Sequence, residues 1–430
     1  MRVRVPGDKS LTQRALVVAA LADGESRISG LLYGGDAAST AGALRALGAA
    51  LPDIPSDGSE IRVEGRGLGG LRTPTDTLDL GNSGTGTRLL LGVLAGSDVT
   101  ATLDGDDSLR TRPMARVTEP LTAMGARFEH HGREGRLPIT VRGARPLGPV
   151  DWQSPVASAQ IKSAILLAGL TGGAFAMLTE PRRSRDHTER MLDAVGAKTV
   201  SHAVAGGWRV ELRDPPSRIE PLDFAVPGDV SSAAFVLALA ALGGAAGPVT
   251  VERVGLNPTR TAFLDVLRRM GAEVRIEESR GAGLEPVGAV TVAPADLTGT
   301  SVGADEVPRL IDELPVVAVL GARARGETRI TGAEELRAKE SDRIGALVTN
   351  LRALGVEVEE HPDGLVVEGT DHPLQGAVRT YHDHRIAMAF GVLAALPGMA
   401  IEVDDPDVAD VSFPGFRELV DRLTTAGAGS

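Results

Sequence analysis

The sequence has no cysteine and few aromatic residues, since Phe, Trp and Tyr make up 3% of its 430 residues. The absence of cysteine excludes disulfides, thiolate metal sites and a cysteine nucleophile. Few aromatic side chains argue against surfaces that stack on single-stranded nucleic acid. The net charge of -12 disfavours nonspecific binding to nucleic acid or to a membrane surface. No apolar run is long enough to span a bilayer and no secretory leader is recognised, so we expect a cytoplasmic protein without nucleic-acid or membrane partners.

Lysine is also scarce: of the 45 basic residues only four are lysines, Lys9, Lys162, Lys198 and Lys339. Arg does not replace Lys in proton transfer, so lysines retained in an Arg-rich chain are candidates for chemistry. Lys9 and Lys339 fall within polar motifs described below. Lys162 and Lys198 receive no predicted role.

A repeat organises what is present. Six predicted helices end in hydrophobic-x-Gly or a close variant, and the intervals between these glycines are 77, 71, 75, 84 and 72 residues. A period of this kind indicates one structural unit used six times. The six glycines are Gly48, Gly125, Gly196, Gly271, Gly355 and Gly427.

Within a unit the pattern reads β-α-β-α-β-β. The second unit predicts helices over 84–95 and 113–124, with strands over 77–80, 99–103, 127–129 and 138–142. The fourth unit predicts helices over 231–241 and 260–270, with strands over 249–254, 273–277 and 289–292. The order is that of an α/β (α+β) fold.

The first helix of each unit is apolar on all sides and is expected to be buried, whereas the second is amphipathic. Helices inside and sheets outside give an inside-out arrangement. Six units divide most simply as three plus three, with a boundary near Val226-Pro227. We therefore expect a first domain over 9–226 and a second made of 1–8 and 227–430.

Polar residues gather where the predicted helices begin. Helix N-termini attract anions, so equivalent helix starts favour binding of anionic ligands. Any one of these motifs is also typical of a capped helix with solvated charges, and it is their recurrence at the same place that argues for a site. The motif around Lys9 and Ser10 is not a Walker A loop, and the glycine-rich turn 81–88 lacks the dinucleotide-binding order of glycines. The cationic members are Lys9, Arg14, Arg112, Arg185, Lys339, Arg343 and Arg385, and the carboxylates are Asp312 and Glu340.

This set suits a site that binds two multiply anionic small molecules and moves protons between them. His382 and His384 alone do not make a metal site, and we expect no metal and no cofactor.

The motifs together resemble the 5-enolpyruvylshikimate-3-phosphate synthase family, from Val5 to Phe416. Any one of them is weak, but eight in order are specific. The resemblance implies two domains of three β-α-β-α-β-β units, an active site in the cleft between them, and enolpyruvyl transfer from phosphoenolpyruvate (PEP) to shikimate 3-phosphate. The motifs are Pro-Gly-x-Lys9-Ser10, Gly-Asn82-x-Gly84-Thr85, Arg112-Pro, Ser158-Ala159-Gln160, Arg185-Asp-His-Thr-Glu, Ile-Asp312-Glu, Lys339-Glu340-Ser-Asp-Arg343 and Asp-His-Arg385-Ile-Ala-Met.

The resemblance also implies roles for single residues. Asp312 takes the proton of the attacking hydroxyl, while Glu340, with Lys9, protonates the PEP methylene carbon. The shikimate 3-phosphate ligands are Lys9, Ser10, Arg14, Ser158, Ala159, Gln160, Arg185, Asp312 and Lys339. The PEP ligands are Lys9, Asn82, Gly84, Thr85, Arg112, Gln160, Arg343 and Arg385. Gly84 leaves room in the PEP pocket, which predicts inhibition by glyphosate, and we expect a monomer.

The chain departs from the family pattern at a few positions. Many members carry a Lys near Val411, and Asp8 stands where Ser is more usual. The ends look short for the family. Three alternatives stay open: a related transferase acting on another cyclic alcohol, UDP-N-acetylglucosamine enolpyruvyl transferase, whose usual loop cysteine is missing here, and a non-catalytic anion-binding relative.

Overall fold

The computed structural model describes residues 1–278 and 284–425, which divide into two compact units. One unit is Gly7–Val226, and the other combines Met1–Pro6 with Pro227–Ser430. Gly7 and Asp8 thus belong to the first of these, although the sequence analysis placed them with the other domain. The predicted helix stop at Gly427 lies outside the described residues.

The unit Gly7–Val226 contains three sheets with the strand orders β12-β2-β3, β4-β5-β7-β6 and β10-β11-β9-β8. In each sheet one pair is parallel and the others are antiparallel. The strands are β2 (Glu25–Ser29), β3 (Ile61–Glu64), β4 (Leu78–Asp79), β5 (Thr100–Asp104), β6 (Arg127–His130), β7 (Ile139–Arg142), β8 (Val150–Gln153), β9 (Ala176–Glu180), β10 (Thr199–Val204), β11 (Gly207–Leu212) and β12 (Asp223–Ala225). The helices are α1 (Lys9–Leu21), α2 (Gly35–Ala46), α3 (Gly84–Ala95), α4 (Asp107–Thr111), α5 (Ala115–Ala123), α6 (Ala159–Gly172) and α7 (His187–Ala194).

The other unit repeats this plan with the orders β1-β13-β15-β14, β16-β17-β19-β18 and β20-β21. Its strands are β1 (Arg2–Val3), β13 (Val249–Gly255), β14 (Val274–Glu278), β15 (Val287–Val292), β16 (Ser301–Val302), β17 (Glu327–Ile330), β18 (Val358–His361), β19 (Gly364–Glu368), β20 (Gln375–Val378) and β21 (Ala400–Val403). Its helices are α8 (Val230–Ala241), α9 (Ala262–Arg269), α10 (Leu314–Arg323), α11 (Arg343–Ala353), α12 (His384–Ala394) and α13 (Phe416–Thr425), with short 3-10 turns η1 (Val307–Arg309), η2 (Glu334–Ala338) and η3 (Pro406–Val411).

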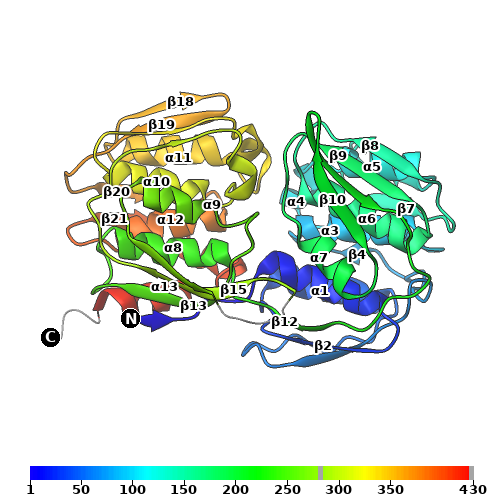
Figure 1. Ribbon diagram of the computed structural model, residues 1–430. Coiled ribbons are helices and arrows are strands. Elements are labelled where there is room, and N and C mark those ends of the chain that lie inside the picture. The colour runs from blue at the N-terminus through cyan, green and yellow to red at the C-terminus, as the bar shows by residue number, and fades with distance from the viewer. Residues whose placement is uncertain (279–283, 426–430) are drawn as a thin grey trace. The chain divides into compact units, whose positions relative to one another are not determined.

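The apolar first helices lie inside their units, as predicted. In α8 all residues from Val230 to Ala241 are buried. This helix has no polar face, so its folding free energy is most favourable when every side is removed from water. Helix α3 contacts both α1 and α6 in one unit, and α8, α10 and α12 contact one another in the other. Figure 1 shows the sheets of each unit on the outside of these helices. The predicted α/β fold with inner helices and outer sheets is confirmed.

Three of the six repeats, the first, the fourth and the sixth, differ from the predicted plan. The first has no leading strand of its own, and β12, from the end of the unit, pairs in parallel with β2. The sixth has only the pair β20-β21 among the described residues, followed by η3 and α13. Similarly, β1 at the start of the chain supplies the strand beside β13.

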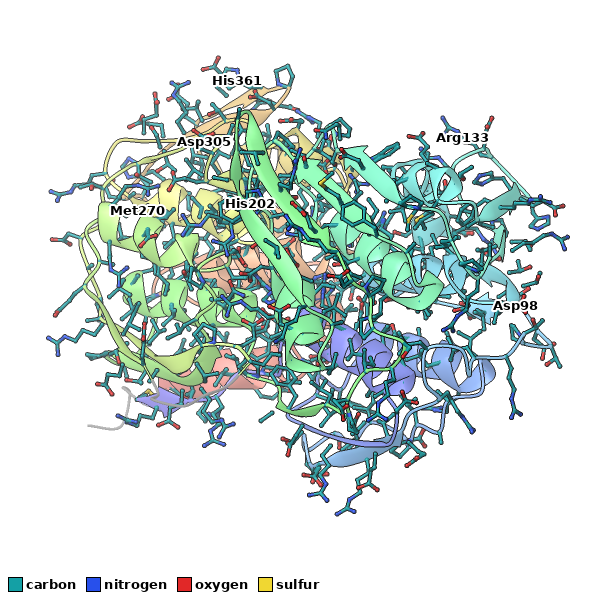
Figure 2. The ribbon with its side chains drawn as sticks, turned by 45° about the vertical axis from the view of Figure 1, so that its right-hand side comes forward. Asp98, Arg133, His202, Met270, Asp305 and His361 are labelled. Carbon is teal, nitrogen blue, oxygen red and sulfur yellow. The ribbon has the colours of Figure 1, made fainter. Side chains whose placement is uncertain are left out.

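Charged side chains are exposed on outer strands and loops of both units. Figure 2 shows the side chains of Asp98, Arg133 and His202 on the surface, and all three residues are exposed. Met270, at the end of α9, is buried instead, which fits the predicted amphipathic second helix. Among residues 1–278 and 284–425, no helix is both long and apolar enough to cross a membrane.

Candidate active site

The predicted site residues of the unit Gly7–Val226 lie at the starts of its helices. Lys9 is the first residue of α1, and Asp8 caps that helix by accepting a hydrogen bond from the Leu11 amide at 2.8 Å. The Lys9 ammonium lies 3.2 Å from a carboxylate oxygen of Asp36, in the first turn of α2. A helix N-terminus disfavours a cation, so Asp36 compensates for the position of Lys9. The sequence analysis had not identified Asp36.

Arg14 lies one helical turn after Ser10 and is only 4% exposed. Its guanidinium donates to the carbonyl of Ser10 at 3.1 Å, to the hydroxyl of Thr188 at 2.8 Å and to the hydroxyl of Ser163 at 3.1 Å. These two hydroxyls are 2.6 Å apart. Arg14 therefore joins α1 to the starts of α6 and α7, and a shift of either helix moves its guanidinium.

Gly84 begins α3 beside two guanidinium groups. A Cβ on this residue would lie 3.0 Å from Nη1 of Arg112 and 3.0 Å from Nη1 of Arg88, closer than such contacts normally are. Arg112 donates to the side-chain oxygen of Asn82, whose amide nitrogen donates to Asp106 at 2.7 Å. The structure thus brings the predicted residues Asn82, Gly84 and Arg112 together.

Gln160 connects α6 to α3. Its side-chain nitrogen donates to the Thr85 hydroxyl at 3.2 Å, and its oxygen accepts from Arg88 at 2.8 Å. Arg88 is buried and also donates to the carbonyl of Gly84. Sequence reasoning missed Arg88, although its position four residues after Gly84 places it on the same side of α3.

The remaining predicted residues of this unit mark two more helix starts. Ser158 caps α6 by accepting from the Ile161 amide at 3.5 Å, and Ala159 is the first residue of that helix. Arg185 is half-buried in the segment between β9 and α7, directly before the cap residue Asp186. The segment thus presents a cation where α7 begins.

In the other unit the predicted residues form a charged cluster around Arg343, the first residue of α11, which is 1% exposed. Its guanidinium lies 2.6 Å from Glu340, 2.8 Å from Asp383 and 3.4 Å from Asp312. Burial acts to lower the pKa of Arg343, but the carboxylates raise it above its ordinary value, first of all Asp383. The guanidinium stays charged and holds both predicted proton-transfer carboxylates, Asp312 and Glu340.

Two further contacts complete the Arg343 cluster. The Lys339 ammonium lies 3.8 Å from Asp312. Asp383 is fully buried, caps α12 by accepting from the Arg385 amide at 2.9 Å, and accepts from the Ser341 hydroxyl at 3.0 Å. Asp383 thereby fixes the start of α11 to the start of α12. The sequence analysis assigned no role to Asp383, although an acidic residue at a helix cap is a recognisable signal.

Arg385, in the first turn of α12, has a different environment. It is 4% exposed, and its Nη1 forms no hydrogen bond with the described residues. No carboxylate in the described part of the chain pairs with it, and its guanidinium lies 5.8 Å from the centroid of the Phe235 ring. Burial of a charge without a counter-ion is costly, so this cation is suited to an anionic ligand.

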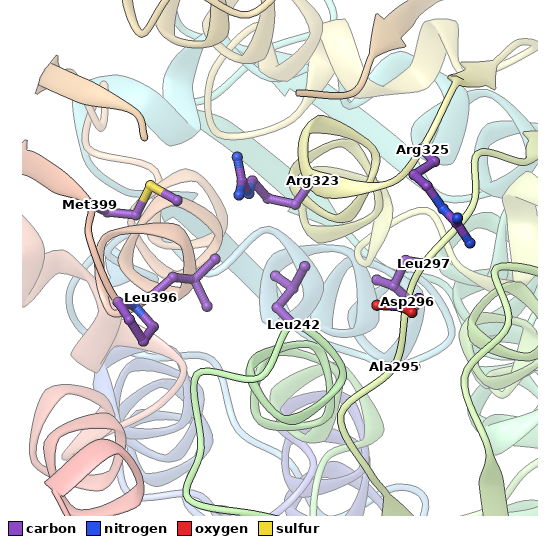
Figure 3. A pocket seen from close by; sticks show the side chains of 9 residues that line it. Leu242, Ala295, Asp296, Leu297, Arg323, Arg325, Leu396 and Met399 are labelled. Carbon is purple, nitrogen blue, oxygen red and sulfur yellow. The ribbon is translucent and has the colours of Figure 1, made fainter. Parts of the chain in front are cut away.

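A pocket of about 300 Å³ lies elsewhere, at the C-terminal ends of α8, α10 and α12 (Figure 3). None of the predicted site residues lines it. Arg323 at its edge is occupied, because it donates to the carbonyls of Thr370, Asp371 and His372. The pocket therefore does not change the assignment of the site to the helix starts.

Comparison with known proteins gives a consistent result. Residues 1–420 match the family model of EPSP synthase (3-phosphoshikimate 1-carboxyvinyltransferase). The chain is 48% identical over 418 residues to 3-phosphoshikimate 1-carboxyvinyltransferase of Alkalilimnicola ehrlichii, covering 97% of this chain and 92% of that protein. It is 48% identical over 426 residues to the enzyme of the same name from Gloeobacter violaceus, covering 98% and 96%.

Solved structures agree with the fold. EPSP synthase from Acinetobacter baumannii matches with a TM-score of 0.83 and 37% identity, covering 98% of this chain and 95% of that one. The enolpyruvyl transferase NikO from Streptomyces tendae matches with a TM-score of 0.72 at 21% identity, a likeness of fold alone.

Proposed function

This chain belongs to the EPSP synthase family, and on that premise we propose how its residues perform the family's reaction. The enolpyruvyl group of PEP is transferred to the 5-hydroxyl of shikimate 3-phosphate, and inorganic phosphate is released. The fold, the relatives and the helix-start residues all support this function. It leaves no need for a metal or a cofactor in the proposed steps.

The observation that carries the assignment to these residues is the buried Arg385. Its Nη1 lacks a hydrogen-bond partner and its guanidinium lacks a carboxylate among the described residues. A charged hydrogen bond donated by Arg385 to an oxygen of an anionic ligand would satisfy this nitrogen and contribute about 1.5–3 kcal/mol. We assign this contact to PEP.

The proposed ligands come from both units. For PEP they are Lys9, Asn82, Gly84, Thr85, Arg112, Gln160, Arg343 and Arg385. For shikimate 3-phosphate they are Lys9, Ser10, Arg14, Ser158, Ala159, Gln160, Arg185, Asp312 and Lys339. In this proposal the units are the two domains of the enzyme, and the substrates engage both.

The chemistry is an addition followed by an elimination. Asp312 accepts the proton of the 5-hydroxyl while the hydroxyl oxygen forms a bond to C2 of PEP. In the same step Glu340, assisted by Lys9, donates a proton to C3 of PEP. The tetrahedral adduct then collapses: the Glu340 carboxylate takes a proton back from C3, and the C2–O bond to phosphate breaks, which restores the C2–C3 double bond. Phosphate leaves with the electrons of that bond and with the proton that Asp312 had accepted, so Asp312 and Glu340 return to their starting states. A positioned acid or base of this kind accelerates a step by about 10²–10⁴-fold.

The contact with Arg343 at 2.6 Å bears on the role of Glu340. A guanidinium at that distance favours an ionised carboxylate, whereas the proposed acid must carry a proton. Two anionic substrates oppose the field of Arg343, so we propose that Glu340 takes up its proton as they bind. Asp312 lies 3.4 Å from the same guanidinium and also 3.8 Å from the Lys339 ammonium, and we propose that this second cation keeps it ionised, so that it acts as the base.

Three further properties belong to the proposal. We expect the enzyme to work as a monomer in the cytoplasm. Glyphosate is expected to inhibit it at micromolar to low-millimolar concentrations, because Gly84 leaves space beside Arg112. Full activity in a large excess of glyphosate would contradict that expectation.

The test is phosphate release from PEP and shikimate 3-phosphate by the purified protein. We expect turnover in the wild type and loss of about 10²-fold or more in Asp312→Ala. Asp305→Ala is the matched control, since Asp305 is an exposed aspartate of the same unit and has no proposed role. Wild-type protein that binds PEP without releasing phosphate would assign the reaction to another cyclic alcohol.

A further inference from the structure

Lys162 is the least exposed cation of the unit Gly7–Val226. It is the fourth residue of α6 and has no exposed surface. Its ammonium lies 2.8 Å from Glu189 and 3.3 Å from Glu180, and donates to the carbonyl of Ser184 at 3.3 Å. The proposed reaction uses none of these four residues, so the cluster needs an explanation of its own.

The three partners of Lys162 lie along one continuous stretch. Glu180 ends β9, Ser184 lies in the following segment, and Glu189 belongs to the first turn of α7. Glu180 also accepts from the amide and the hydroxyl of Ser184, at 2.8 and 2.9 Å. Lys162 therefore contacts Glu180 before the segment 181–186, Ser184 within it and Glu189 after it. Arg185 directly follows Ser184, so these contacts also hold the backbone that carries Arg185.

The same cluster reaches Arg14 through α7. Thr188 precedes Glu189 and accepts from the Arg14 guanidinium. Ser163 follows Lys162 and accepts from the same guanidinium. A change in the distance between α6 and α7 therefore changes both hydroxyl partners of Arg14 at once.

We propose that Lys162 is a positioning residue for shikimate 3-phosphate: its ammonium fixes the segment that carries Arg185 and, through α7, the guanidinium of Arg14. The inference rests on the proposed function, because both arginines are assigned to that substrate there. Lys suits this position because a compact ammonium with three donors serves three acceptors on different sides, which a planar guanidinium does not. The cluster touches none of the proposed PEP ligands in any described contact.

The variant Lys162→Met combined with Glu180→Gln and Glu189→Gln tests the proposal. Substituting Lys162 alone leaves two buried carboxylates without their cation, whereas the triple variant keeps size and removes all charge together. We expect the KM for shikimate 3-phosphate to rise about tenfold or more, since misplaced binding groups lose affinity steeply, while kcat and the KM for PEP change little. Lys198→Met is the matched control, because Lys198 is exposed and only donates to the Asp193 carbonyl.

Two kinetic results for the triple variant would overturn the proposal. One is a lowered Tm with both KM values unchanged, which would make the cluster a stability element only. The other is an equal rise of both KM values, which would indicate a general disturbance. If the triple variant does not fold, Ser184→Ala removes one of the bonds to Glu180, and a smaller rise confined to shikimate 3-phosphate is expected. An unchanged KM in that variant would also overturn the proposal.

Hydrogen exchange separates this inference from the proposed function. In the triple variant, amides of 181–189 should exchange faster than in the wild type, while those of 81–88 should not. Unchanged hydrogen exchange in 181–189 would refute the positioning role of Lys162, whether or not the variant is active. Wild-type protein without turnover would refute the proposed function. Faster exchange in the triple variant would then still show that Lys162 and its carboxylates hold the segment 181–189 in place.

Discussion

Each unit contains a buried cation that lies within ion-pair distance of two or more carboxylates, and these two clusters differ in their access to solvent. Lys162 lies between Glu180 and Glu189, whose side chains are 0% and 7% exposed. Arg343 also has a fully buried partner in Asp383, but Glu340 and Asp312 are 20% and 18% exposed. A sealed cluster holds its surroundings in place, whereas carboxylates at a surface can exchange protons with a bound ligand. In our proposals this arrangement therefore serves positioning in one unit and chemistry in the other.

The largest effect on activity is expected from Glu340→Gln in the Arg343 cluster, whose carboxylates Glu340 and Asp312 are partly exposed. The amide keeps the shape and still accepts from Arg343, but it does not donate the proton that C3 of PEP requires. We expect kcat for phosphate release to fall by about 10²–10⁴-fold, with a Tm close to that of the wild type. Glu334→Gln, on the exposed start of η2, is the control. A kcat within tenfold of the wild type would assign the acid to another group.

Arg385→Gln sharpens the comparison, because Arg385 is a buried cation without carboxylates. Removing an uncompensated charge relieves the ligand-free protein, so its Tm should hold or rise. The KM for PEP should increase roughly 10- to 100-fold, as expected for the loss of one charged hydrogen bond. Steady-state kinetics and thermal unfolding check both parts, with the exposed Arg379→Gln as control. A lower Tm together with an unchanged KM would make Arg385 a structural residue.

Gly84→Ala tests space rather than charge. The new Cβ would lie 3.0 Å from Arg112 and 3.0 Å from Arg88, which holds Gln160, so one of them must shift. Overpacking costs about 1–3 kcal/mol, which corresponds to roughly 5- to 150-fold in the KM for PEP. The inhibition constant of glyphosate should rise further. Inhibition and KM equal to those of the wild type would show that Gly84 does not border the pocket.

The sequence predicted much of the fold because the relevant signals are local. The helix over Gly84–Ala95 has the bounds that were predicted, and the inner helices are buried as their apolar composition indicated. Strand pairing across long separations left no such signal. The sequence pattern of β12 and β1 does not show that they pair with β2 and β13, because their partners lie some 200 residues away or more.

The candidate site was predicted at the level of residues but not of contacts. Lys9, Arg343 and Arg385 were all identified as cations at helix starts, and they lie there. Their environments differ, because Lys9 pairs with Asp36, Arg343 pairs with Asp383, and Arg385 has no such carboxylate among the described residues. Each aspartate comes from another element, and nothing in the local sequence marks it as the partner of that cation. Lys162 received no role for the same reason, since Glu180 and Glu189 meet it only in the folded unit.

The smallest effect is expected from Glu189→Gln in the sealed cluster, and it depends on pH. Burial raises the pKa of Glu189 above its ordinary value of about 4.5, Asp186 adds to the rise, and Lys162 only partly opposes it. The protonated form is thus favoured by folding, so its contribution to stability is complete below pH 4.5 and is lost as the pH rises through the raised pKa. Glutamine mimics the protonated carboxyl at every pH and leaves Glu180 to pair with Lys162. We therefore expect the Tm of Glu189→Gln to approach that of the wild type near pH 4.5 and to exceed it increasingly towards pH 8. Each ~1 kcal/mol of difference in the free energy of unfolding should appear as a difference of about 2–4 °C in Tm. A wild type that becomes the more stable protein as the pH rises would mean that Lys162 stabilises the Glu189 carboxylate more than burial opposes it.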